Sequence, residues 1–156
     1  MTPTANAIGT RLRDGSERGA VIVEFALVLP LLALLFLTVI DLGLVVHESQ
    51  VLQNAAREGA RFSALPISWI DPINPVATEA AIRQRVTDYC AEEGVVVAPG
   101  SITINQSFPI DVGGGLSALG SEIVVSYERP FLIPGAPLLP FTRVTLSSRA
   151  VFRNFY

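Results

Sequence analysis

The sequence contains no lysine, and among its 156 residues it has only one histidine and one cysteine. All 11 basic residues are arginine, which we interpret as a sign of genome composition rather than of function. The formal net charge is −3 and no basic cluster is present, which excludes the electrostatic footprint of a nucleic-acid-binding protein. With Cys90 as the single cysteine, no internal disulfide framework can form.

Groups that carry catalytic chemistry are equally scarce. His47 is predicted on a helix surface, and no second histidine is available for a metal site or a triad. Cys90 lies on an apolar helical face, where cysteine behaves as a small buried hydrophobe. The glycine run at 113–115 lacks the lysine and the Ser/Thr of a phosphate-binding loop, and the carboxylates are scattered. We therefore expect no catalytic, cofactor-binding or metal-binding residues and no small-molecule substrate.

What the sequence has in excess is apolar residues, and they are concentrated in one run. Residues 20–40 contain a single charge, Glu24. As a helix this run would span about 31 Å, the thickness of a bilayer's hydrocarbon core. The apolar region of a secretory signal peptide is shorter, about 7–15 residues, and no small-x-small cleavage site follows Ile40. The run therefore predicts a retained transmembrane helix with the lipid bilayer as partner.

The charges on either side of the run predict its orientation. Arg11, Arg13 and Arg18 precede it, and the next basic residue after it is Arg57. Because basic residues collect on the cytoplasmic side, the N-terminus should be cytoplasmic and the C-terminal part extracytoplasmic. This arrangement is that of a single-pass protein of the cytoplasmic (inner) membrane.

Glu24 has two interpretations. In the first, it lies near the cytoplasmic end of the span and bends back toward the headgroups. The second depends on its neighbours: a polar, basic leader ends at Gly19, the apolar run begins at Ala20, and counting from there Glu24 is fifth and Phe25 sixth. This spacing resembles the processing site of type IV prepilins, particularly those of the tight-adherence (Flp) class.

Two longer stretches within residues 18–64 are "RGAVIVEFALVLPLLALLFLTVIDLG" and "LQNAAREGAR". With them the chain resembles the TadE-like family, minor pilins or pseudopilins of tight-adherence pilus systems. The resemblance implies cleavage after Gly19 by a prepilin peptidase, partners among other pilin, TadE-like or TadG-like subunits, and a role in pilus assembly or secretion. The new ammonium of Ala20 could then pair with Glu24 of a neighbouring subunit, since neither charge is tolerable alone in hydrocarbon. The alternative is an unprocessed, membrane-anchored binding domain.

The helix is predicted to continue past the membrane. Pro30 falls inside the span, as either a passive kink or a bend used in packing. After Ile40 the helical pattern persists to Ala64, with an apolar stripe and an Ala/Gly-rich segment that favours close packing of the chain's own domain over a subunit interface. Glu58 and Arg61 are spaced to pair on the outer face. The predicted segments are a leader at 1–19, a transmembrane helix at 20–40, a juxtamembrane extension at 41–64 and a small domain at 65–156.

The small domain is predicted to be α+β and pilin-like: a second helix over 75–93 and a three-stranded antiparallel sheet. The helix would have Asn74 as its N-cap, would end at Gly94, and would carry a Glu79–Arg83 pair on its exposed face. Its apolar stripe is predicted to be Ile82, Val86, Tyr89 and Cys90.

Three segments alternate as strands do, at 101–108, 121–128 and 143–152. Residues 110–120 read as a flexible connection, and the proline-rich segment 129–141 reads as a loop that folds back over the core or forms a contact patch. Trp69 is predicted in the core. The residues predicted to face inward are Ile102, Ile104, Phe108, Ile123, Val125, Tyr127, Val144, Leu146, Ala150 and Phe152.

Overall fold

The computed structural model describes residues 13–66, 77–132 and 142–155. The chain divides into two compact units, Met1–Leu42 and Gly43–Tyr156. One helix, α1 (Arg13–Ala64, 52 residues), belongs to both. The predictions for Trp69 and Asn74 and those for loop residues 133–141 lie outside the described residues.

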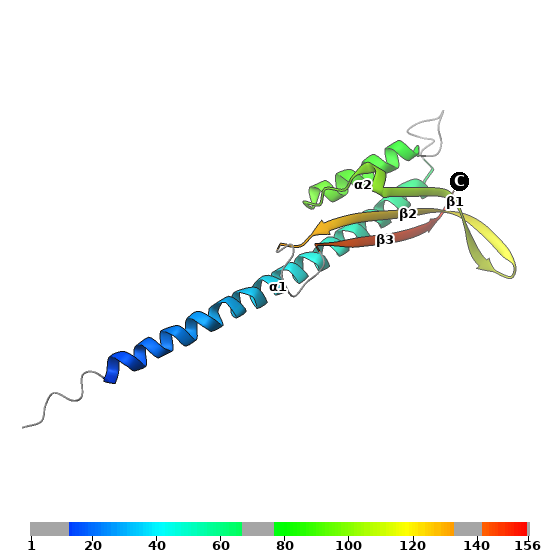
Figure 1. Ribbon diagram of the computed structural model, residues 1–156. Helices are drawn as coiled ribbons and strands as arrows, with labels where there is room; N and C mark the ends of the chain where they lie inside the picture. Colours follow the sequence, from blue (N-terminus) through cyan, green and yellow to red (C-terminus); the bar gives the residue numbers. More distant parts are fainter. Residues whose placement is uncertain (1–12, 67–76, 133–141, 156) are drawn as a thin grey trace, which may run out of the picture. The chain divides into compact units, whose positions relative to one another are not determined.

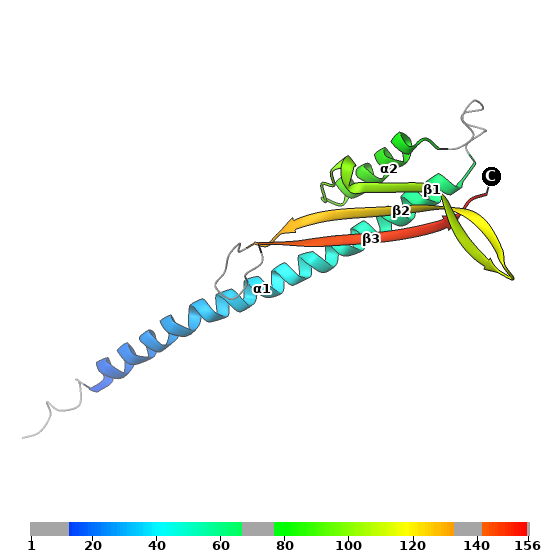
Figure 2. The ribbon, with the colours of Figure 1, turned by 45° about the vertical axis from the view of Figure 1, so that its right-hand side comes forward.

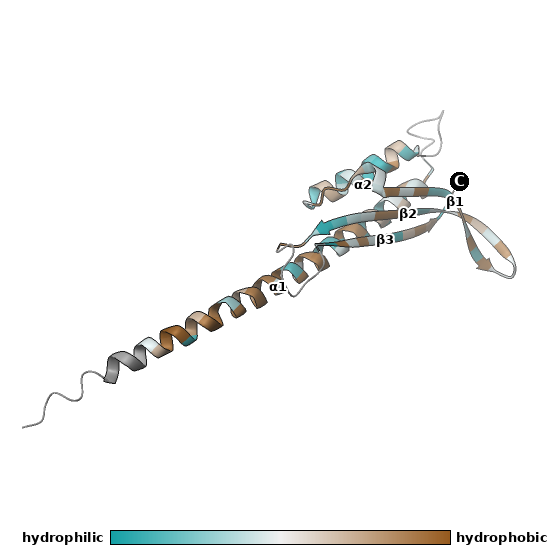
Figure 3. Cartoon of the chain, in the orientation of Figure 1, coloured by the Kyte–Doolittle hydropathy of each residue, from teal (hydrophilic) through white to brown (hydrophobic). Residues whose placement is uncertain are grey.

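The first unit is the N-terminal part of α1. The helix begins at Arg13, upstream of the apolar run, so residues 13–19 of the predicted leader are helical. Pro30 lies inside α1 and does not end it. From Gly19 onward the helix is long and apolar enough to cross a membrane, and Figure 3 shows the N-terminal part of α1 mostly in the brown of hydrophobic residues, with a few paler and teal bands. The predicted single apolar span is therefore present as a helix.

The second unit has an α+β fold, as predicted (Figures 1 and 2). Besides the C-terminal part of α1 it contains α2 (Glu79–Glu92), a 3-10 turn, η1 (Pro99–Ser101), and three strands. The strands are β1 (Ile102–Gly113), β2 (Leu116–Pro130) and β3 (Arg143–Arg153). They form one antiparallel sheet in the order β1-β2-β3.

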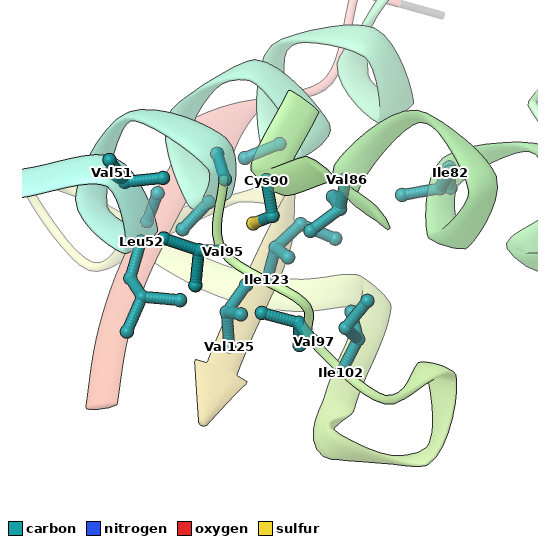
Figure 4. Packing of buried hydrophobic residues seen from close by; sticks show 14 of the residues in the cluster. Val51, Leu52, Ile82, Val86, Cys90, Val95, Val97, Ile102, Ile123 and Val125 are labelled. Atoms are coloured by element: carbon teal, nitrogen blue, oxygen red, sulfur yellow. The ribbon is translucent and has the colours of Figure 1, made fainter. Parts of the chain in front are cut away.

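The core lies between the two helices and one face of the sheet, here called the inner face (Figure 4). Most of the core residues come from the predicted apolar stripes of the two helices. Leu52 of α1 and Ile82, Val86 and Cys90 of α2 are fully buried. The inner face supplies the rest, because alternate strand residues point toward the helices. The buried hydrophobic residues of the cluster are Val51, Leu52, Ala55, Ala56, Ala60, Ala77, Ile82, Val86, Cys90, Val95, Val97, Ile102, Ile123, Val125 and Ala150.

Gly59 marks the closest approach of α1 to the rest of the unit. A Cβ at this position would lie 2.4 Å from Cγ2 of Val86 on α2 and 3.7 Å from Cγ2 of Ile123 on β2. The Ala/Gly-rich segment of α1 therefore packs against the chain's own domain, which is the interpretation favoured from sequence.

The boundaries and polar contacts of α2 differ from those predicted. The helix begins at Glu79, and its N-cap is Thr78, whose hydroxyl accepts from the Ala81 N–H at 3.3 Å. The predicted Glu79–Arg83 pair is replaced, because Arg83 donates to the backbone carbonyls of Ile102, at 2.5 Å, and of Pro99. These carbonyls need a donor where the chain turns into β1, and the guanidinium supplies several N–H groups at once.

The predicted Glu58–Arg61 pair is also replaced. Glu58 accepts from Arg85 of α2, with 2.8 Å between Oε1 and Nη2. Glu58 lies on the side of α1 that faces α2, so a partner across the helix pair is nearer than one on the same helix. This interaction and the carboxylates of Glu92 and Asp88 raise the pKa of Arg85 above its usual value, the Glu58 hydrogen bond contributing most.

The strands are longer than predicted, and the predicted flexible connection over 110–120 is wrong. These residues extend β1 and β2 into a hairpin closed by a two-residue turn, Gly114 and Gly115, with φ of +66° and +79°. Positive φ at both central residues is the requirement of the type I′ turn that matches strand twist. The glycines therefore close a tight turn.

One face assignment in β1 is also wrong. Asn105 pairs with Glu122 while Phe108 pairs with Gly120, so three steps along β1 match two along β2. This one-residue bulge moves Phe108 to the outer face, away from the helices, where the guanidinium of Arg149 lies 5.1 Å from its ring centroid. On β3 the predicted alternation holds; Phe152 pairs with the buried Ser121 on the inner face, although its own side chain is 37% exposed.

Candidate functional site

The Gly19–Ala20 bond lies within α1, seven residues from the first helical residue. Both residues are exposed, and a Cβ at Gly19 would meet nothing within 4 Å. Packing against the described residues therefore does not require a glycine at position 19. Instead, glycine leaves the backbone accessible and weakens the helix at this point, since it is about 1 kcal/mol less favourable than alanine in a helix interior.

Glu24 lies four residues after Ala20, so the two residues share one face of α1, one turn apart. The Glu24 side chain is exposed and has no ion-pair partner among the described residues. Phe25 is 60% exposed, on an adjacent part of the helix surface. The residues singled out from sequence are thus brought onto two successive turns, with the carboxylate available to a group from outside the chain.

The surface of the span is apolar on all sides. Its large side chains from Val21 to Ile40 are exposed, and only Leu34 is partly covered. The hydroxyl of Thr38 donates to the Leu34 carbonyl at 2.8 Å, which satisfies it within the helix. Pro30 has no N–H, so the Ala26 carbonyl lacks its usual intrahelical donor. Glu24 is consequently the one acidic or basic side chain on this surface between Gly19 and Ile40.

The second unit holds the other candidate groups. Cys90 is buried and unpaired in the core, and burial raises the pKa of its thiol to about 11. His47 is exposed on α1, as predicted. No group of three or more metal-ligating side chains occurs within the part of the chain that the structure describes.

A buried ion pair that no sequence pattern predicts joins two distant residues. Arg129 of β2 lies 3.0 Å from Glu48 of α1, and their side chains are 5% and 16% exposed. The two residues are 81 positions apart. Such a pair ties the end of β2 to the helix but carries no local sequence signal.

Comparison with known proteins gives one match. Residues 19–61 match the sequence model of the family described as TadE-like protein. No curated protein and no solved structure matches the chain. The family match confirms the resemblance inferred from "RGAVIVEF" and begins at Gly19 itself. Together with the apolar helix it supports a membrane-anchored, pilin-like protein associated with the components of a Tad pilus.

Proposed function

We propose that this chain is a pseudopilin subunit, cleaved between Gly19 and Ala20, that assists assembly of a tight-adherence pilus or a related secretion apparatus. One observation carries the proposal: the TadE-like match starts at Gly19, and the only charge of the following span is Glu24 at the fifth position. The protein acts through assembly and is not an enzyme. Its partners are a prepilin peptidase and other pilin, TadE-like or TadG-like subunits.

The proposed topology follows from the arginines of the leader. The leader stays in the cytoplasm, α1 crosses the inner membrane once, and residues 43–156 form the extracytoplasmic domain. The peptidase then meets the Gly19–Ala20 bond at the cytoplasmic end of the span. Cleavage there removes the basic leader and leaves the whole apolar helix on the mature protein.

Cleavage requires the bond to leave the helix, because a peptidase must reach the carbonyl and the following N–H. The bond lies about two turns from the start of α1, so only a helix end has to unwind. Helix ends fray readily, and glycine lowers the cost further by about 1 kcal/mol. The exposed position of Gly19 leaves no packing to be broken.

After cleavage, Ala20 would carry an ammonium at the membrane boundary. Glu24 of a neighbouring subunit can neutralise this ammonium only when the two helices are in one register, so the ion pair stabilises only the correctly aligned assembly. The carboxylate also lies near the positive end of the shortened helix, which favours it by about 0.3–1 kcal/mol. Both effects depend on the position of Glu24 relative to the new terminus.

The experiment is N-terminal sequencing of the chain from cells that contain the matching peptidase. We expect a mature protein beginning at Ala20. Gly19→Leu should abolish cleavage, whereas Gly43→Leu, a matched change at another exposed helical glycine, should leave it intact. A mature chain that keeps Met1 would support the alternative, an unprocessed single-pass anchor, for which the continuity of α1 through Gly19 is the favouring observation.

A further inference from the structure

Two contacts define how β2 runs along α1 in the second unit. The Ser63 hydroxyl of α1 donates to the Ser121 hydroxyl of β2 at 2.9 Å, and nearer the span Glu48 pairs with Arg129 at 3.0 Å. The stretch of β2 between these contacts is about 26 Å long and that of α1 about 22 Å, so the two elements lie side by side. β2 therefore runs antiparallel to this part of α1 (Figures 1 and 2). Its last residues lie beside the part of α1 that leads back to the apolar span.

This end of the second unit, here called the near end, consists of residues 43–48, 129–132 and 142–144. The Phe131 N–H donates to the Thr142 carbonyl at 3.2 Å, so the two strands stay paired up to this point. Phe131 lies about 7 Å beyond Arg129, which corresponds to roughly four to five residues of α1. Since Arg129 is beside Glu48, Phe131 is level with about Leu44.

The near end presents apolar side chains to its surroundings. Leu44 and Val46 of α1 are 37% and 52% exposed, and Leu132, at the end of β2, is 52% exposed. The charges behind them are turned inward and neutralised, because Glu48 and Arg129 pair with each other and are largely buried. The near end therefore has the surface of a group of residues that contacts a medium less polar than water.

The near end continues the apolar surface of the span. After Ile40 the carboxylate-bearing Asp41 is buried, Leu42 is exposed, and the first exposed polar side chain on α1 is that of His47. From Ile40 to Val46 the helix rises about 9 Å, and one headgroup layer of a bilayer is about 5–8 Å thick. A hydrocarbon core that ends at Ile40 therefore places this stretch of α1 in the headgroup layer.

We propose that the near end is a lipid-binding surface that lies in the headgroup layer of the bilayer, with Leu44, Val46 and Leu132 in contact with phospholipid. Continuity identifies the partner, because one helix carries the same apolar surface from the span into the near end. Arg143 adds charge complementarity: its side chain is 68% exposed and forms only a surface pair with Glu128, so its guanidinium can bind phosphate groups. The inference rests on the proposed membrane anchoring and not on cleavage.

Such a contact restrains how the domain stands on the membrane. The tilt and rotation of a spanning helix are set by its contacts at the interface. Leu132 belongs to the sheet and stands to one side of α1, so its contact with lipid would hold that side of the domain toward the bilayer. The turn of the β1–β2 hairpin lies at the opposite end of the sheet and would point away from the membrane.

The test is fluorescence quenching in the full chain, reconstituted at low density in vesicles of phosphatidylethanolamine and phosphatidylglycerol. A fluorophore on Leu132→Cys reports the near end, and Leu116→Cys at the hairpin turn is the matched control, since these leucines are 52% and 69% exposed. The parent chain, whose Cys90 is buried, gives the background. Phospholipid with a nitroxide on its headgroup should quench the label on Leu132→Cys several times more strongly than that on Leu116→Cys, and aqueous iodide should show the opposite order.

A second pair of variants keeps the test valid where Leu132→Cys disturbs the fold, which thermal unfolding against the parent chain would reveal. Val46→Cys and Gln53→Cys lie about two turns apart on one face of α1, and both side chains are exposed. The label on Val46→Cys should be quenched by the nitroxide lipid and the label on Gln53→Cys mainly by iodide.

Two results would overturn the proposal. Equal quenching of Leu132→Cys and Leu116→Cys by the nitroxide lipid would mean that the near end lies in water. A label on Leu132→Cys that is shielded from both quenchers would mean that protein, such as a second copy of the chain, covers the near end.

A label in the middle of the span separates this proposal from the proposed function. Leu35→Cys places it on an exposed side chain of that segment. Quenching of Leu35→Cys by phospholipid with a nitroxide deep in its acyl chain, without headgroup quenching of Leu132→Cys, would refute the surface contact alone. No quenching of Leu35→Cys would refute membrane anchoring and the surface contact with it. Cleavage is read independently from the N-terminal sequence of the same sample.

Discussion

Gly59→Ala is the sharpest test of how α1 joins the domain. The new methyl carbon would stand 2.4 Å from Cγ2 of Val86, well inside van der Waals contact. Val86 is fully buried, and a β-branched side chain in a helix has one strongly preferred rotamer, so it cannot turn aside cheaply. Overpacking of this kind costs about 1–3 kcal/mol. Alanine returns about 1 kcal/mol through its better helix propensity.

We therefore expect a net loss of about 1 kcal/mol in the free energy of unfolding, which corresponds to a fall in Tm of about 4 °C for a domain of this size. Thermal unfolding of the full chain in detergent, followed by circular dichroism, measures it. Gly43→Ala is the matched control, because a Cβ at Gly43 meets nothing within 4 Å and should leave Tm unchanged or raise it. If Gly59→Ala raised Tm as much as Gly43→Ala, the close approach of α1 and α2 would be refuted.

Two further predictions concern the same core. A fragment beginning at Asp41 should unfold cooperatively and one beginning at Leu65 should not, because Val51, Leu52 and the buried alanines of α1 form part of the core; equal cooperative transitions would show that α1 is dispensable. Cys90 should be alkylated at pH 8 at least about a hundred-fold more slowly in the folded chain than in denaturant, since a thiol pKa of about 11 against an ordinary 9.0 lowers the thiolate fraction by about that factor and burial also keeps the reagent away from the sulfur. The neutral buried thiol contributes fully to stability below pH 9, and this contribution is lost as pH rises toward 11. A free energy of unfolding with the same pH dependence in the parent chain and in Cys90→Ala would contradict the burial of the thiol.

The sequence predicts the elements of this fold well because its strongest patterns are periodic. The continuation of α1 to Ala64, the buried stripe of α2 and the alternation of β2 depend on apolar spacing alone. What it missed depends on contacts between distant residues. Arg83 donates to the Pro99 and Ile102 carbonyls around the start of β1. Glu58 pairs with Arg85 across the two helices, where local spacing suggested partners on the same helix.

The outer face of the sheet shows the same limit. A single extra residue reverses the strand, and the side chains that fix it, Gln106, Ser63 and Asn154, come from three separate segments. Strict alternation therefore places Phe108 on the wrong face. The glycines at 113–115 were equally ambiguous, because the composition of a flexible linker is also that of a type I′ turn. Only the pairing of β1 with β2 shows that these glycines form a tight turn and not a flexible linker.

The candidate assembly site is the part most accessible from sequence, because its residues are local. Gly19, Ala20 and Glu24 lie on two turns of one helix, so spacing alone places them together. What spacing does not give is the charge partner of Glu24. Its carboxylate is exposed and faces the same side of the helix as Ala20, so under the proposed cleavage it would be available to the ammonium of an adjacent chain.

Glu24→Gln should impair assembly while leaving insertion and cleavage intact. A charged side chain costs about 2.5–3.5 kcal/mol at the centre of a span on insertion scales, and less near an end, so removing the charge does not hinder insertion. Cleavage depends on Gly19 and the leader, which are unchanged. What is lost is the charge that neutralises a neighbour's Ala20, which then stays buried and unpaired, and leaving one partner of a buried pair costs about 3–5 kcal/mol. We expect normal amounts of processed protein by immunoblot and few pili by electron microscopy. Glu24→Asp, which keeps the carboxylate on a shorter side chain, should retain more pili than Glu24→Gln. Normal piliation in a strain whose only copy carries Glu24→Gln would show that Glu24 is a tolerated residue at the membrane boundary, and that register is set by other contacts of α1.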